Sequence, residues 1–199
     1  MKFKIVSLFV LCAILISCGT SRQGGKKQRK GTKAQVVLTP EQQRKYDYFF
    51  LEASRLKMKD DYSAAFDLLQ HCLTINPNAS SALHEISQYY MYLKQVPQGQ
   101  AALEKAVEND PDNYWYSQGL ASLYQQQNEM QKATNLLENM ATRFSDRMDP
   151  LYSLLDIYNR LEEYDNVITT LNRLEEKMGK NEQLSMEKFR IYLQKKDNP

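Results

Sequence analysis

Two stretches decide the fold: SAAFDLLQHCLTINPN at residues 63–78 and PQGQAALEKAVENDPD at residues 97–112. They superimpose without a gap at an offset of 34 residues, which places Asn76-Pro77-Asn78 on Asp110-Pro111-Asp112. In each stretch, apolar residues at helical spacing lead into a proline turn that ends the helix. The chain after Thr39 keeps this periodicity and shows almost no strand-type alternation, so we expect an all-α fold built from repeated helix pairs.

The first helix has a clear start signal. Thr39 can act as the N-cap, Pro40 suits the first helical position, and Gln42 completes a capping box three residues after the cap. The helical region is therefore expected to begin at residue 39 and to form one domain over residues 39–199.

A period of 34 residues with two helices per unit resembles the tetratricopeptide repeat (TPR). With the turn proline at the thirty-second place, the predicted units are 46–79, 80–113, 114–147 and 148–181, followed by a terminal helix over 182–196. The third unit departs from the motif at Ser117 and Ser145, and the fourth at Gly179. The resemblance implies a right-handed solenoid of antiparallel helix pairs. Small residues would let the two helices of a pair approach closely, namely Ala53, Ala65, Ala106, Ala121 and Ala133.

The same resemblance implies a concave groove lined by the first helix of each unit. The matching places hold these candidate ligand-contacting residues: Phe50, Ser54, His84, Gln88, Met91, Tyr92, Trp115, Gln118, Gln125, Tyr152, Asp156 and Asn159. Aromatic anchors beside side-chain amides suit an extended peptide or a protein segment. The alternative for Phe50, Tyr92 and Trp115 is that they only pack between units.

One ligand class of the family is disfavoured. Chaperone-type TPR domains clamp a C-terminal carboxylate with Lys, Asn and Arg, and the corresponding places here hold Phe50, Ser54, Glu85, Trp115 and Gly119. We therefore do not expect a carboxylate clamp.

The N-terminus reads as an export signal. Lys2 and Lys4 precede an apolar run from Ile5 to Ile16, interrupted only by Ser7, which is too short to span a bilayer. The sequence Leu-Ile-Ser-Cys at residues 15–18 resembles the lipobox of bacterial lipoproteins. That resemblance implies a signal peptide over residues 1–17 and acylation of Cys18, the only covalent group expected; no other cofactor is predicted.

Residues 18–38 are predicted to be the lipidated cysteine and a basic tether. Six Lys or Arg and no acidic residue lie in 19–38, whereas residues 39–199 carry 18 basic and 24 acidic side chains. Two interpretations stay open: a plain flexible tether, or a tether that also adheres to anionic lipid head groups. Nucleic acid is not expected as a partner, because export removes it and no aromatic residue is interleaved. In similar lipoproteins, Gly after the acylated Cys goes with the outer membrane, so we expect an outer-membrane lipoprotein facing the periplasm of a Gram-negative bacterium.

No catalytic or metal-binding motif is found, and an enzyme is not expected. Cys72 lies on an apolar helical stripe and should be a buried structural residue. The spacing of His71, Cys72 and His84 matches no metal site, and His71 should be on the surface. The paired carboxylates at residues 162–163 and 175–176 are expected to be solvated charges.

The terminal helix is predicted to direct Met186, Phe189, Tyr192 and Leu193 toward the stack, with Leu184 and Ile191 broadening the apolar face. It is either a solvating cap, or the end of a shortened array, or a helix that completes its repeat against another subunit or partner. The sequence thus favours a lipid-anchored scaffold that binds a protein or extended peptide. The alternative is a lipoprotein of nutrient uptake that captures glycan on its aromatic residues.

Overall fold

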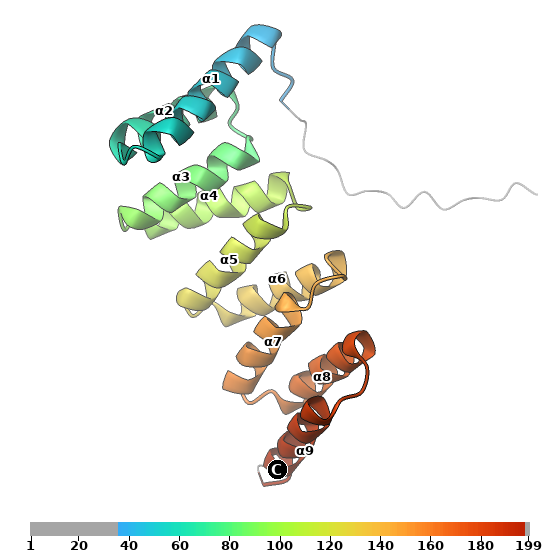
Figure 1. Cartoon of the computed structure of the whole chain (residues 1–199). Helices are drawn as coiled ribbons and strands as arrows, with labels where there is room; N and C mark the ends of the chain where they lie inside the picture. Colours follow the sequence, from blue (N-terminus) through green and yellow to red (C-terminus); the bar gives the residue numbers. More distant parts are fainter. Residues whose placement is uncertain (1–35, 198–199) are drawn as a thin grey trace, which may run out of the picture. The chain divides into compact units, whose positions relative to one another are not determined.

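The structure is a computed structural model of the chain, and it describes residues 36–197 (Figure 1). The predicted signal peptide, Cys18 and all but the end of the tether lie outside these residues. The described part contains α helices and no strand, which confirms the all-α class. The helices are α1 (Pro40–Lys57), α2 (Tyr62–Ile75), α3 (Ser80–Tyr92), α4 (Val96–Asn109), α5 (Tyr114–Gln126), α6 (Met130–Arg143), α7 (Asp149–Arg160), α8 (Tyr164–Met178) and α9 (Glu182–Asp197).

Helix α1 begins as its sequence predicts. The Thr39 hydroxyl accepts a hydrogen bond from the Gln42 amide at 3.2 Å, and the Gln42 side chain accepts one from the Thr39 amide at 2.9 Å. Pro40 lies at the start of the helix. The reciprocal pair satisfies two amides that have no partner within the helix, so the capping box is confirmed.

Each helix lies beside the one that follows it in the chain (Figure 1). The small residues predicted to allow close approach are all buried, with exposed fractions of 0–2% at Ala53, Ala65, Ala106, Ala121 and Ala133. Around them pack fully buried side chains such as Ile86, Leu137, Leu154 and Leu171. Since a single helix pair buries only part of its apolar surface, each pair depends on its neighbours for stability.

The turn inside each pair repeats with the period of the sequence. Asp60, Lys94, Asn128 and Glu162 stand 34 residues apart and all have left-handed φ angles of 56–63°. The next residue in each case donates its amide to a carbonyl five residues earlier, at 2.8–3.0 Å, as in Asp61 to Leu56. This is the Schellman arrangement, which satisfies the last carbonyls of a helix. Glycine is the usual residue at a left-handed position. Because none of the four turns has glycine there, the sequence did not predict this turn type.

Tyrosine hydroxyls join consecutive units. Tyr124 on α5 donates to Glu104 on α4 at 2.9 Å, and Tyr158 on α7 donates to Glu138 on α6 at 3.2 Å. Arg173 on α8 also donates to Glu138, at 2.7 Å. Burial beside these carboxylates raises the pKa of Tyr124, and it raises the pKa of Tyr158 to about 12. Both tyrosines therefore stay protonated and act as donors at neutral pH.

The orientation predicted for the terminal helix is wrong. Leu184 and Ile191 are buried against the core, whereas Met186, Phe189, Tyr192 and Leu193 are 48–61% exposed. Between the two buried residues, Lys188 forms an ion pair with Glu175 of α8 at 2.6 Å. Leu184, Lys188 and Ile191 share one side of α9. This side faces the other helices because Lys188 forms its ion pair with α8 there. The opposite side, which holds more apolar residues, is exposed.

Candidate functional site

The candidate residues lie on one surface, which we call the A-helix face. It comprises the side chains that α1, α3, α5 and α7, the first helices of the four pairs, present at the second, fifth, ninth, twelfth and thirteenth places of each unit. Among the twelve candidates, Ser54, Gln88, Tyr92, Trp115, Tyr152 and Asp156 are exposed. Half-buried are Phe50, His84, Met91, Gln118, Gln125 and Asn159.

The aromatic candidates divide into packing residues and free ones. Phe50 stacks on Tyr46, with ring centroids 5.9 Å apart, and packs against two core clusters, so it has a packing role. Met91 belongs with it, because its methyl group fills the space above Gly99. Tyr92 and Trp115, in contrast, are 81% and 65% exposed and are not packed between units.

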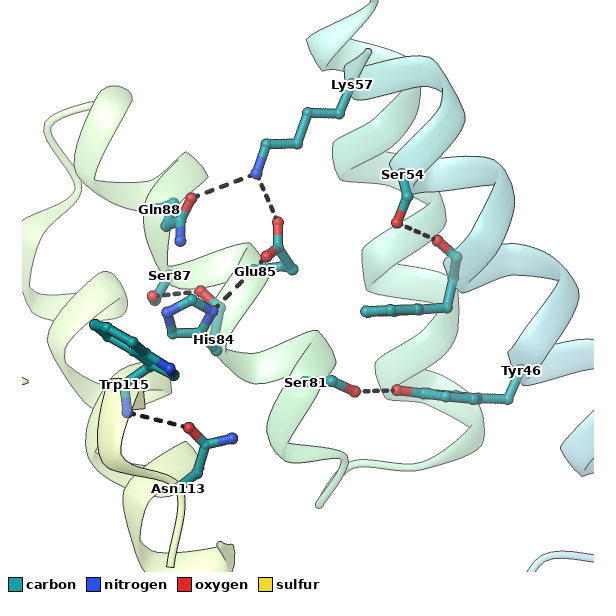
Figure 2. Close-up of polar contacts among 11 residues, drawn as sticks. Tyr46, Ser54, Lys57, Ser81, His84, Glu85, Ser87, Gln88, Asn113 and Trp115 are labelled. Carbon is teal, nitrogen blue, oxygen red and sulfur yellow. Dashed lines mark hydrogen bonds and ion pairs between the residues drawn. The ribbon is translucent and has the colours of Figure 1, made fainter. Parts of the chain in front are cut away.

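Trp115 is fixed at the start of α5 by its neighbours (Figure 2). Asn113 caps the helix, and its side chain accepts a hydrogen bond from the Trp115 amide at 3.2 Å. The ring of Tyr114 meets the indole edge-on at 5.2 Å, and the Arg147 guanidinium lies 5.3 Å from the indole centroid. The backbone and one side of the indole are therefore held, while most of the side chain stays exposed.

A charged network ties α1 to α3 at the same surface (Figure 2). Lys57 donates to Glu85 at 2.8 Å and to the side chain of Gln88 at 3.5 Å. On its other side Glu85 lies 3.7 Å from Nδ1 of His84. The His84 imidazole and the Lys57 ammonium together lower the pKa of the Glu85 carboxyl to about 2, although its burial opposes them. The His84 ring also stacks on Tyr116 of α5, with ring centroids 4.8 Å apart, so it connects the second unit to the third.

A pocket of about 280 Å³ opens beside this network. It is lined by Lys57, Tyr62, Gln88, Tyr89 and Tyr92. The Tyr89 hydroxyl is buried and has no hydrogen-bond partner within the described part of the chain. A buried donor without a partner is costly, typically by about 1–3 kcal/mol. Sequence reasoning missed Tyr62 and Tyr89, because neither occupies a groove place of the motif.

A tetratricopeptide-repeat family model matches residues 80–113, the second predicted unit. The fold is a TPR solenoid. No curated protein matches the sequence.

Solved TPR structures resemble the chain at low sequence identity. A TPR protein from Parabacteroides merdae aligns with a TM-score of 0.60 and 16% identity, covering 72% of this chain and 57% of that one. The protein MamA aligns with a TM-score of 0.57 and 19% identity over 67% and 73% of the two chains. YrrB, described as a TPR protein with an unusual peptide-binding site, aligns with a TM-score of 0.57 and 12% identity over 75% and 77%. At these identities the likeness supports the fold alone.

The described residues offer little other candidate chemistry. Cys72 is buried as predicted, its thiol 3.8 Å from the Tyr46 carbonyl, and burial raises its pKa to about 11. His71 is exposed, also as predicted. Among residues 36–197, no group of three His, Cys, Asp or Glu could hold a metal ion. TPR repeats are generally non-enzymatic scaffolds, and a model of this repeat matches residues 80–113.

The expected solvation of the paired carboxylates needs one correction. Glu162 and Glu163 are exposed at the turn before α8, but Glu175 is half-buried in its ion pair with Lys188. Glu175 thus stabilises the position of α9. No helix within residues 36–197 is both long and apolar enough to cross a bilayer.

Proposed function

We propose that this protein is a lipid-anchored TPR adaptor that holds an extended peptide or protein segment on its A-helix face. The observation that carries the proposal is the pocket beside Tyr92, where aromatic and polar side chains converge. Tyr62 and Tyr92 offer aromatic walls, and the Gln88 amide and the Lys57 ammonium offer polar groups. Such a mixture suits an extended peptide that places one side chain in the pocket and pairs its backbone with the Gln88 amide.

The rest of the A-helix face extends the same chemistry. Trp115 and Tyr152 are exposed aromatic residues on α5 and α7, and Gln118 and Gln125 lie between them in sequence. Aromatic side chains contribute large contact areas at low entropic cost, while side-chain amides can pair with the peptide backbone. A peptide would thus meet repeated aromatic and amide groups along the face.

The anchor belongs to the proposal as well. The lipobox-like sequence ending at Cys18, followed by Gly19 and a basic segment, supports acylation and outer-membrane residence facing the periplasm. A direct test compares the full chain with its Cys18→Ser variant in fractionated cells that express each. The wild type should fractionate with the outer membrane and incorporate labelled palmitate, and the variant should do neither. Equal incorporation of palmitate in the wild type and the variant would contradict acylation of Cys18.

Binding is tested with random linear peptides displayed on phage and selected against the purified protein. Selected peptides should bind the Tyr92→Ala/Trp115→Ala variant at least tenfold more weakly, since two exposed aromatic anchors are lost. The matched control is Tyr48→Ala, which removes a 64% exposed tyrosine of α1 outside the A-helix face and should bind like the wild type. Peptides that bind all three proteins equally would contradict the proposal. A glycan that quenches Trp115 fluorescence, with no peptide selected, would favour the nutrient-uptake alternative.

A further inference from the structure

Helix α9 has two unlike sides. Leu184, Lys188 and Ile191 face the stack, where Leu184 and Ile191 join the core and Lys188 pairs with Glu175. The opposite side carries Met186, Phe189 and Leu193, which are 61%, 58% and 48% exposed. Within residues 36–197 no helix covers this side.

The exposed side has the spacing of a paired-helix seam. Glu182, Met186, Phe189, Leu193 and Lys196 follow one another at intervals of four, three, four and three residues. This alternation keeps side chains in one stripe along a helix and is the spacing by which two helices pack along their length. The stripe is about 21 Å long, apolar in the middle, acidic at its N-terminal end and basic at its C-terminal end.

The stripe differs from the surfaces that receive the second helix in the four units. At the eighth place those units hold small buried residues, Ala53, Ser87 and Ala121, or the half-buried Leu155. Phe189 holds the same place in α9, is larger than any of them, and is 58% exposed.

We infer that the stripe binds the α9 stripe of a second copy of this chain, with the two helices antiparallel. The charges select this occupant, because an antiparallel pair brings Glu182 of each copy to Lys196 of the other at both ends. Phe189 then meets Phe189 on the two-fold axis, and Met186 meets Leu193. Glu182 and Lys196 form no ion pair with other described residues, whereas Lys188, Arg190 and Lys195 are already paired within the chain.

The contact is small. The exposed parts of the apolar stripe residues Met186, Phe189 and Leu193 amount to roughly 300 Å² on each copy. This is less than a stable dimer buries, so we expect a weak dimer, with a dissociation constant on the order of 100 μM. The inference does not depend on the peptide-binding proposal, since α9 lies outside the four pairs that form the A-helix face.

Sedimentation equilibrium of the full chain in density-matched detergent tests the dimer, from roughly tenfold below to tenfold above that concentration. The wild type should show a monomer–dimer equilibrium. Phe189→Glu should weaken association more than tenfold, because it places two carboxylates on the axis. Leu51→Glu is the matched control; it adds a charge at a 69% exposed leucine of α1 and should leave association unchanged. A wild type that stays monomeric throughout would overturn the inference and leave the stripe to a different protein.

Charge reversal tests the antiparallel orientation without touching the apolar residues. Glu182→Lys and Lys196→Glu alone should each weaken association about threefold or more, because like charges then meet at both ends. An equal mixture of these two variants, or the double reversal in one chain, should restore it. Failure of both to restore association would exclude the antiparallel pair, as would a loss of association in Leu51→Glu. These variants stay informative if Phe189→Glu folds poorly, which a thermal melt would show.

Discussion

Removing the Tyr158 hydroxyl should destabilise the protein at pH 7 but not near pH 11. At pH 7 the hydroxyl donates to Glu138 at 3.2 Å in a side chain that is only 9% exposed. Losing one such hydrogen bond should lower the free energy of unfolding of Tyr158→Phe by about 1 kcal/mol. In a chain of this length that corresponds to a fall in melting temperature of roughly 2–4 °C.

The alkaline range supplies the sharper part of this prediction. Folding raises the pKa of Tyr158 from 10.0 to about 12. A raised pKa contributes stability that is fully present below pH 10 and is lost as the pH rises toward 12. By pH 11 the wild type should have lost about 1.4 kcal/mol through this residue, which the phenylalanine variant cannot lose. The advantage of the wild type should therefore vanish near pH 11.

Urea unfolding followed by circular dichroism, at pH 7, 9 and 11, measures the difference between the two proteins. Tyr152→Phe is the matched control. Its hydroxyl is at the surface of a 47% exposed side chain and contacts only the Met178 sulfur, so it should behave like the wild type at each pH. A gap between Tyr158→Phe and the wild type that is the same at pH 11 as at pH 7 would refute the reasoning.

Three further outcomes are expected. Folding lowers the Glu85 pKa from 4.5 to about 2, so the ionised carboxylate stabilises the fold above pH 4.5 and this stability is lost on acidification. Between pH 4.5 and 2, urea titrations should show that the free energy of unfolding falls by about 1–3 kcal/mol more in the wild type than in Glu85→Gln. Gly119→Ala should raise the free energy of unfolding by about 0.5–1 kcal/mol, because an added Cβ would lie 3.8 Å from Leu103 in ordinary contact; a lower stability would contradict this packing. Cys72, buried with a pKa of about 11, should react with a thiol reagent only as fast as the protein unfolds, as peptide mass mapping over time can show.

Local signals in the sequence predicted most of the fold. The capping box at Thr39 and the small residues at Ala65 and Ala133 act through neighbours at fixed spacing, so the pattern alone determines their environment. The left-handed turn residues could not be foreseen, since Lys94 and Glu162 have no special preference for that conformation and adopt it because packing on both sides demands it.

The terminal helix and the pocket show where sequence reasoning fails. Counting apolar residues gave α9 the wrong orientation, because the ion pair between Lys188 and Glu175 is made across two helices and is invisible in either one. The pocket was missed for a similar reason. Tyr62 begins α2 and Tyr89 lies away from the groove places of α3, and only the tertiary approach of the helices brings them together.

The most direct test of a peptide-binding A-helix face uses Trp115, the only tryptophan in the protein. A phage-selected peptide free of tryptophan is titrated into the full chain while indole emission is recorded. Binding should shift the emission of the 65% exposed indole to shorter wavelength with a saturable dependence, and Tyr92→Ala should weaken the midpoint at least tenfold. Emission that stays unchanged while an independent assay shows the peptide bound would contradict the account.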